Sequence, residues 1–264
     1  MKKYLVIGNP INHSLSPELH NHWIKENRLD AIYEKKELNN NELEDLILKV
    51  KEGNINGVNV TVPFKNTIIP YLDELSNEAK KTHSVNTIYL KDKKVIGHNT
   101  DIEGFEKAMK NINFNLKNKK IFILGAGGVV PSIIYASIKM GFSEIMISNR
   151  TEKRAEEIKN IFNNIKLVNW GETPDFDVII NATSLGLNQN DKINLDFKKV
   201  GKNKLFYDVI YNPGETSFLK SGKKLGNKCE NGKLMFIYQA FSAFKLWHGI
   251  EPSINDATLK LLDR

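Results

Sequence analysis

The stretch IFILGAGG, Ile121 to Gly128, is the part of the sequence that decides the fold. Its apolar run leads directly into a small-residue cluster, and helical periodicity resumes behind that cluster. Glycines between a strand and a helix let backbone N–H groups at the helix N-terminus approach a pyrophosphate. The pattern therefore predicts a dinucleotide-binding βαβ unit whose cofactor contacts are Gly125, Ala126, Gly127, Gly128 and Val129. The alternative is a tight strand-to-helix turn that binds nothing.

The end of the next strand indicates which dinucleotide is bound. An NAD site places an acidic residue there for the ribose hydroxyls, whereas an NADP site supplies arginine for the 2′-phosphate. The stretch ISNRTEKR, Ile147 to Arg154, has no acid at the strand end and carries two of the four arginines of a lysine-rich chain. We therefore expect NADP, held by Asn149, Arg150, Thr151 and Arg154. The alternative is a pair of solvated charges at a helix start.

Composition narrows the class of protein. The chain has 264 residues, 41% of them hydrophobic, which is enough for two ordinary domains with real cores. The net charge of +7 comes from scattered lysines and not from a clustered patch, so we expect no nucleic-acid partner. A single cysteine, Cys229, excludes a disulfide framework and a multi-cysteine metal site. We expect a cytoplasmic protein without bound metal.

The N-terminus and the apolar runs give no membrane signal. Gly8 to Pro10 interrupt the first apolar run before it could form a signal-peptide core. No apolar stretch approaches the roughly 20 residues that a bilayer span needs. We therefore expect an unexported protein with no membrane partner.

The order of periodicities is mostly strand, helix, strand, which favours an α/β fold of two domains with a cleft between them. We expect an α/β substrate domain at residues 1–101, completed by C-terminal helices at 235–264, and a Rossmann-like, doubly wound domain at 102–234. Helices are expected at 17–27, 42–51, 64–72, 74–81, 102–112, 152–162 and 234–247. Strands are expected at 4–7, 31–38, 58–62, 85–90, 94–97, 121–124, 144–148, 166–169, 177–181 and 205–209.

Polar clusters in the first domain lie at strand ends and in loops, where α/β proteins place their chemistry. The clusters are Asn12–Ser16, Asn59–Lys65, and Asn86 with Asn99–Asp101. Each has a plain structural alternative, because Ser16 and Asp101 could cap helices and Lys65 could be a surface charge. The residues alone leave these alternatives open.

Taken together, the motifs of the chain resemble those of the shikimate dehydrogenase family. The matching segments follow the family's order from residue 6 to about 250: GNPINHSLSPELHN, NVTVPFK, SVNT, HNTD, GAGG, SNRTEKR, INATSLG, YDVIYNP, GKLMFIYQAF and LWHG. The resemblance implies reversible NADP-dependent reduction of 3-dehydroshikimate to shikimate, on the way to chorismate and the aromatic amino acids. It leaves open a monomer or a homodimer.

The resemblance also implies roles for individual residues. Lys65 and Asp101 would be the catalytic pair, because hydride transfer to a ketone builds negative charge on an oxygen that a lysine can protonate. Tyr211 would lie at the substrate near the nicotinamide, and Val209 and Gly232 would touch the nicotinamide half. The further substrate contacts would be Ser14 and Ser16 for the carboxylate, with Thr61, Asn86 and Gln239.

The sequence departs from the family pattern in two places. Ile102 replaces a glycine that commonly follows the aspartate, and Val129 to Pro131 replace small residues with an arginine after them. Neither change removes a catalytic group. Two other functions remain in view: a quinate/shikimate dehydrogenase that also accepts NAD, and a catalytically silent NADP-binding regulator. Methylenetetrahydrofolate dehydrogenases share the layout but not the pocket of Ser14 and Ser16.

Overall fold

The computed structural model describes residues 1–188 and 191–263 and divides into two compact units. The first unit contains Met1–Gly104 and Ile237–Asp263, and the second contains Phe105–Phe236. The expected boundaries after residues 101 and 234 fall inside two helices, α5 (Asp101–Asn111) and α9 (Lys233–His248), and both of these helices cross the division. The last residue of the expected C-terminal segment, Arg264, lies outside the described residues.

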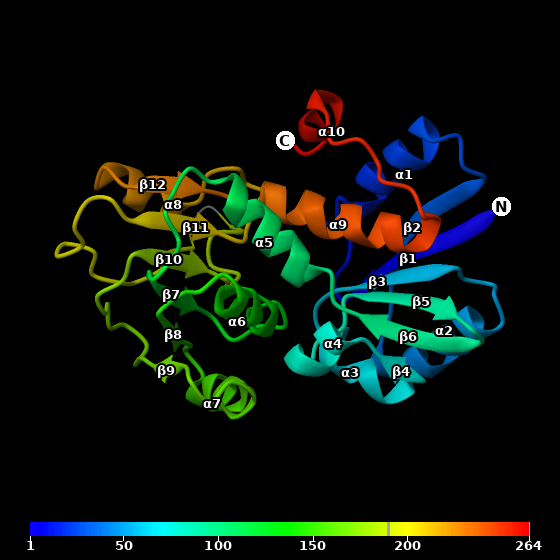
Figure 1. Cartoon of the computed structure of the whole chain (residues 1–264), viewed down its shortest axis with the longest axis horizontal. Helices are drawn as coiled ribbons and strands as arrows, with labels where there is room; N and C mark the ends of the chain where they lie inside the picture. Colours follow the sequence, from blue (N-terminus) through cyan, green and yellow to red (C-terminus); the bar gives the residue numbers. More distant parts are fainter. Residues whose placement is uncertain (189–190, 264) are drawn as a thin grey trace. The chain divides into compact units, whose positions relative to one another are not determined.

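The first unit is built on a mixed sheet with the strand order β2-β1-β3-β5-β6-β4 (Figure 1). Strands β1, β2 and β3 are mutually parallel, whereas β5 pairs antiparallel with both β3 and β6. The strands are β1 (Lys2–Gly8), β2 (Ala31–Glu37), β3 (Gly57–Val60), β4 (Glu74–Leu75), β5 (Thr87–Lys91) and β6 (Lys94–His98). The helical segments are α1 (Ser16–Glu26), η1 (Asn40–Glu42), α2 (Leu43–Lys51), α3 (Phe64–Thr67), η2 (Ile69–Tyr71), α4 (Asn77–Thr82) and α10 (Asp256–Lys260), with the ends of α5 and α9.

Both faces of this sheet are covered, which explains the continuous burial of β1. Leu5 and Ile7 belong to a core cluster with Leu46 and Val50 of α2. Successive side chains of a strand point to opposite faces. Tyr4 accordingly packs against Trp247 of α9 with ring centroids 5.1 Å apart. The polar residues that follow β1 and β3 are thus held between two packed layers.

The second unit is an all-parallel sheet with the strand order β12-β11-β10-β7-β8-β9. Numbered within this unit, the order is the dinucleotide-binding order 3-2-1-4-5-6 read from the other edge, so the strand order reverses between β7 and β10. The strands are β7 (Lys120–Leu124), β8 (Glu144–Ser148), β9 (Lys166–Leu167), β10 (Val178–Asn181), β11 (Leu205–Asp208) and β12 (Lys228–Glu230). The helices are α6 (Val130–Lys139), α7 (Glu152–Ile161) and α8 (Ser217–Lys224).

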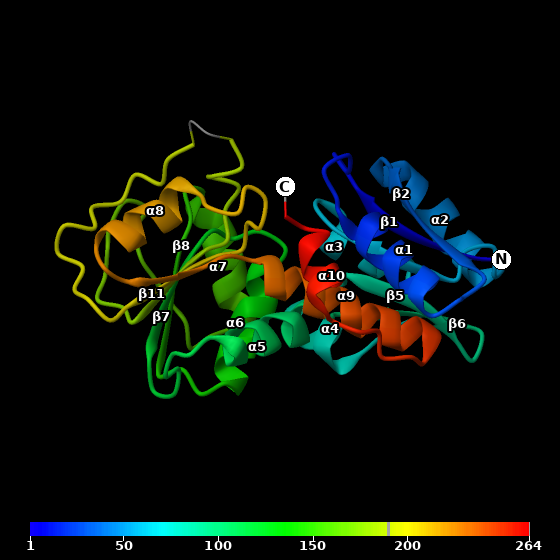
Figure 2. The same ribbon diagram turned by 90° about the horizontal axis from the view of Figure 1, so that it is seen from above.

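Helices cover both faces of the second sheet, as a doubly wound fold requires. Figure 2 shows α8 on one face and α6 on the other. Phe206 of β11 packs with Phe218 of α8, and the next residue, Tyr207, meets Phe105 of α5 edge to face at a centroid distance of 5.7 Å. The predicted two-domain α/β fold with a Rossmann-like sheet is confirmed.

Several expected elements differ in detail. The helix expected at 64–72 divides into α3 and η2, because Pro70 has no N–H to donate to the preceding turn. Residues 74–75 form β4, and the helix there begins only at Asn77 with Ser76 as its N-cap. Strand β12 was not expected from the sequence, whereas α10 lies in the segment expected to hold the C-terminal helices.

No helix among the described residues is long and apolar enough to span a bilayer.

Candidate functional site

The expected catalytic pair meets inside the first unit. Lys65 lies on α3 and Asp101 begins α5, and their side chains form an ion pair with Nζ 2.5 Å from Oδ2. The two residues are only 8% and 5% exposed. A surface charge would not be buried in this way, so the surface alternative for Lys65 is wrong. The arrangement places the amino group of Lys65 next to a carboxylate, with both side chains shielded from solvent.

Asn86 holds the second oxygen of this carboxylate. Its Nδ2 donates to Asp101 Oδ1 at 2.9 Å and lies 3.5 Å from Gln239 Oε1. Its Oδ1 accepts from the backbone N–H of Thr100 at 2.7 Å. The amide is therefore oriented by its own bonds, with the nitrogen facing the carboxylate. The structure thus brings together four expected site residues, Lys65, Asn86, Asp101 and Gln239.

Ser14 and Ser16 adjoin each other at the start of α1. The Ser14 Oγ accepts from the backbone N–H of Ser16 at 3.3 Å. The expectation that Ser16 caps this helix is wrong, because Leu15 is the N-cap and makes no side-chain capping bond. The Ser16 side chain instead hydrogen-bonds the buried phenol of Tyr33. Its hydroxyl is therefore not committed to the helix end.

Thr61 follows β3 beside the end of β1. Its backbone N–H donates to the carbonyl of Ile7, and its methyl group would lie 2.7 Å from a Cβ placed on Gly8. Thr61 is half-buried. The contacts therefore place Thr61 at the same edge of the sheet as Gly8, without joining its side chain to the Asp101 network.

The glycine cluster of the second unit forms the predicted strand-to-helix turn. Gly125 has a φ of +111°, and a Cβ there would lie 2.7 Å from the carbonyl oxygen of Ala182. A Cβ on Gly127 would meet no atom within 4 Å. The first glycine is needed for close backbone packing, whereas the second leaves open space in front of α6. Pro131 lies in the first turn of α6, where its missing N–H costs little.

The arginines lie at the carboxyl end of β8 and at the start of α7. Arg150 and Arg154 are both exposed, and neither forms an ion pair with an acidic group in the described part of the chain. Thr151 is the N-cap of α7, but its side chain makes no capping bond. The Asn149 side chain donates to the Thr151 carbonyl at 2.8 Å and fixes this turn.

Val209 and Gly232 lie directly against each other. A Cβ on Gly232 would come within 2.0 Å of the Val209 carbonyl oxygen, so only glycine fits. Tyr211 stacks on Phe236 with ring centroids 4.4 Å apart. These residues belong to the second unit, as do all the expected cofactor contacts, whereas the other expected substrate contacts belong to the first.

Three buried polar residues were not among the predicted site residues. Tyr33 donates to Asn59 Oδ1 at 2.7 Å in the first unit, and Asn181 donates to Asp208 Oδ1 at 3.0 Å in the second. Asn181 and Asp208 each end a strand whose other residues are apolar or aromatic. A polar residue at the last position of a buried strand was the signal available in the sequence.

The comparisons with known proteins agree with this geometry. Residues 6–88 match the family model described as the shikimate dehydrogenase substrate binding domain, and residues 106–209 match the one described as shikimate / quinate 5-dehydrogenase. The shikimate dehydrogenase (NADP(+)) of Pelagibacter ubique is 57% identical over 262 residues, covering 99% of each chain. The chain belongs to the shikimate dehydrogenase family. The predicted resemblance is confirmed.

Solved structures of the shikimate dehydrogenase family superpose along the whole chain. The enzyme from Aquifex aeolicus is 36% identical with a TM-score of 0.89, covering 99% of this chain and 97% of that one. The enzyme from Thermus thermophilus, in complex with NADP(H) and shikimate, is 30% identical with a TM-score of 0.90, covering 99% and 98%. The activity is NADP-dependent reduction of 3-dehydroshikimate to shikimate and its reverse, an oxidoreductase step of aromatic amino acid biosynthesis.

The residues of the second unit fit the NADP of this family. The open space at Gly127 leaves room for phosphate oxygens at the N-terminus of α6. Two guanidinium groups without an acidic partner in the described chain suit a 2′-phosphate, because their forks donate in parallel pairs. A dinucleotide with both a pyrophosphate and a third phosphate therefore matches the donors present.

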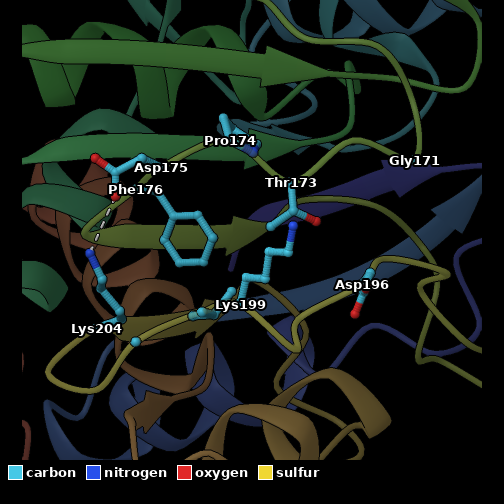
Figure 3. Close-up of a pocket in the computed structure, with 10 residues that line it drawn as sticks. Gly171, Thr173, Pro174, Asp175, Phe176, Asp196, Lys199 and Lys204 are labelled. Atoms are coloured by element: carbon cyan, nitrogen blue, oxygen red, sulfur yellow. Dashed lines mark ion pairs between the residues drawn. The ribbon is translucent and has the colours of Figure 1, made fainter.

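A cavity of about 610 Å³ lies elsewhere in the second unit (Figure 3). It is lined by residues that precede β10 and β11, including Phe176 and Lys204. Because all strands of this sheet are parallel, the cavity lies at the opposite end from Gly125 and Asp208. Lys204 is paired there with Asp175 at 3.7 Å. We assign this cavity no part in the site.

The described residues contain no group of three or more His, Cys, Asp or Glu side chains that could hold a metal ion.

Proposed function

We propose that Lys65 and Asp101 handle the proton of the shikimate dehydrogenase reaction. The observation that carries this proposal is the buried ion pair, 2.5 Å from Nζ to Oδ2, with the second carboxylate oxygen held by Asn86. In the reducing direction Lys65 gives a proton to the ketone oxygen as negative charge develops on it, and in the oxidising direction the neutral amine takes the proton from the hydroxyl. Asp101 fixes the ammonium group in position and stabilises its charge.

The remaining polar residues of the first unit would bind and orient the substrate. Ser14 and Ser16 carry two hydroxyl groups two positions apart at the start of α1, which suits a carboxylate. Asn86 and Gln239 lie beside the ion pair and would bind ring hydroxyls, with Thr61 as a further contact. From the second unit, Tyr211 would contact the substrate near the nicotinamide. Binding of this kind holds the reacting oxygen at Lys65.

The second unit would hold the cofactor along the carboxyl ends of its strands. Backbone groups of Gly125 to Val129 would bind the pyrophosphate, and Asn149, Arg150, Thr151 and Arg154 would bind the adenosine ribose and its 2′-phosphate. Val209 and Gly232 would contact the nicotinamide half. When bound, NADPH supplies the hydride that reduces the ketone carbon, and NADP⁺ accepts it in reverse.

The test of this function follows nicotinamide absorbance with shikimate or quinate, each against NADP⁺ and NAD⁺. We expect turnover with shikimate and NADP⁺ to exceed the other three combinations. If Lys65 transfers a proton during the hydride step, kcat/KM for shikimate is lower in D₂O than in H₂O. Equal rates in both solvents would show that proton transfer does not limit the rate. Equal turnover with NAD⁺ would contradict the proposed binding of the 2′-phosphate by Arg150 and Arg154.

We also propose a cytoplasmic location, and the oligomeric state stays open between a monomer and a homodimer. The single cysteine, Cys229, supports a reducing compartment, since no disulfide can form within the chain. Sedimentation of the purified protein over a range of concentrations separates a monomer from a homodimer.

A further inference from the structure

Asp208 is a fully buried carboxylate at the carboxyl end of β11 that the reaction described above does not use. Three donors converge on it. Thr216 Oγ1 donates to Oδ2 at 2.6 Å, and the Ile210 backbone N–H and Asn181 Nδ2 each donate to Oδ1 at 3.0 Å. These donors come from the start of α8, from the segment after β11 and from the end of β10. One side chain thus ties together three separate segments.

Asn181 extends this arrangement to the loop after β10. Its Oδ1 accepts from the Thr183 hydroxyl at 2.7 Å, and its Nδ2 also donates to the Leu185 carbonyl at 3.0 Å. The loop in turn packs on the glycine turn, because the Ala182 carbonyl lies against Gly125. Asp208 therefore supports the backbone at the point where the strand order reverses, which is where doubly wound folds bind their ligands.

The charge on Asp208 has no compensating cation among the contacts described. Burial raises the pKa of its carboxyl to about 6, and the bonds from Thr216, Ile210 and Asn181 offset this rise only in part. The neighbouring titratable group is the buried phenol of Tyr207, whose pKa is also raised, chiefly by burial and then by Glu230 and Asp208. A neutral amide side chain at position 208 would be sufficient if this position served packing alone. An ionised carboxylate, by contrast, accepts from all three donors at once.

We propose that Asp208 is a positioning residue for the cofactor: through Asn181 and Ile210, its ionised carboxylate holds the 181–185 loop and the Val209 backbone in the arrangement that binds the nicotinamide half of NADP. The inference rests on the proposed placement of NADP along this edge of the second unit. In this proposal Asp208 and Asn181 contact neither the substrate nor the cofactor, and they act only by positioning the backbone that does.

Protonation of Asp208 should weaken this arrangement. Hydrogen bonds to an ionised acceptor are roughly twice as strong as neutral ones, so protonation weakens the bonds from Thr216, Ile210 and Asn181. The Thr216 hydroxyl would turn its own hydrogen away and accept from the protonated carboxyl. Affinity for NADP should therefore fall as the pH drops through about 6. The 2′-phosphate of NADP⁺ also titrates near pH 6. The effect must therefore be measured as the ratio of the KM for NADP⁺ between a variant and the wild type, because the phosphate contributes equally to both.

The test compares Asp208→Asn with Asp177→Asn, a matched change at the opposite end of the same sheet. At pH 8 we expect Asp208→Asn to raise the KM for NADP⁺ roughly tenfold, the size of one charge-assisted hydrogen bond, with the KM for shikimate within about twofold. The variant-to-wild-type ratio of the KM for NADP⁺ should fall toward one below pH 6, where the wild-type carboxyl is itself protonated. Asp177→Asn should leave this ratio at one throughout.

The melting temperature of Asp208→Asn gives a second measurement, because a purely structural role of Asp208 predicts that it falls. Removal of a buried charge without a cationic partner should leave the melting temperature of Asp208→Asn equal to or above that of the wild type at pH 8. A lower melting temperature together with equal rises in both KM values would overturn the proposal. So would a ratio of KM values that does not change with pH.

Thr216 provides an independent variant should Asp208→Asn fail to fold. Thr216→Val removes one donor from the carboxylate, so the midpoint of the pH dependence of the KM for NADP⁺ should move upward, whereas Thr216→Ser should leave it in place. An unmoved midpoint in Thr216→Val counts against the proposal. If the wild type itself shows no shikimate-dependent reduction of NADP⁺, the proposed function fails. If the wild type is active but the variants behave like it, only this inference fails.

Discussion

The two units organise their polar groups in opposite ways. In the first unit the groups of the expected chemistry are already bonded to one another, with Lys65 paired to Asp101 and Asp101 accepting from Asn86. In the second unit the groups expected to meet phosphate face open space or solvent, as Gly127 and Arg150 do. The difference follows from the task. A proton donor must be oriented and shielded before the substrate arrives, whereas phosphate binding needs free donors.

The largest effect should come from breaking the bonded pair. We expect Lys65→Ala to lower kcat roughly 10² to 10⁴-fold, the usual contribution of general acid–base catalysis, with shikimate binding largely intact. Steady-state kinetics and calorimetric titration with shikimate measure the two quantities. Lys51→Ala is the matched control, since this lysine pairs with Asp73 on the surface. Near wild-type turnover in Lys65→Ala would end the assignment.

The next prediction tests the exposed arginines of the second unit. Arg150→Ala should raise the KM for NADP⁺ about 10 to 100-fold, as expected for loss of a charge-assisted contact, and should leave the KM for shikimate unchanged. The KM for NAD⁺, which lacks the 2′-phosphate, should not rise. Lys153→Ala, a neighbouring charge on α7, serves as the control. Equal rises in the KM values for NADP⁺ and shikimate would show that Arg150 does not bind the 2′-phosphate specifically.

A third change sharpens the comparison by adding a methyl group where the second unit is most tightly packed. Gly232→Ala places a Cβ 2.0 Å from the Val209 carbonyl oxygen, so the backbone there must shift. We expect the free energy of unfolding to fall by about 1–3 kcal/mol, in the range of overpacking, with a higher KM for NADP⁺. Gly214→Ala is the control, because its nearest atom would lie 3.9 Å away. Urea unfolding curves and NADP⁺ kinetics decide the outcome.

The smallest effect at neutral pH concerns a buried histidine of the first unit. His20 is stacked on Tyr33 at a centroid distance of 4.2 Å, and its ring nitrogens have no hydrogen-bond partner among the described residues. Burial, with a further contribution from His248, lowers the pKa of His20 to about 3. The unfolded chain therefore binds a proton below pH 6.5 that the folded chain excludes, and stability falls as the pH drops from 6.5 toward 3.

His20→Phe should remove this pH dependence. Between pH 6 and pH 4 the free energy of unfolding of the variant should fall less steeply than that of the wild type, by about 1.4 kcal/mol per pH unit. Turnover at pH 8 should not change. Denaturant titrations at several pH values measure the slopes, with His13→Phe, an exposed site, as the control. Identical slopes in wild type and His20→Phe would show that His20 titrates normally.

Local patterns were sufficient for much of the fold and for the cofactor. The turn at Gly125, the arginines after β8 and the strand–helix alternation are all encoded within short windows of sequence. Ser16 shows where such patterns mislead, because a serine before Pro17 is typical of an N-cap, yet Leu15 takes that position. Two other interactions engage Ser16 instead: Ser14 accepts from its backbone N–H, and its side chain hydrogen-bonds Tyr33.

The sequence by itself determined the class of fold, the family and the preference for NADP, because glycine, proline and arginine act through local geometry and charge. Only the tertiary structure decided which polar groups are partners. Asn86 and Gln239 lie 153 positions apart, and Asp208 bonds Asn181 across a separation of 27. Such pairings depend on burial, since polar groups that leave water must find donors and acceptors wherever the fold places them.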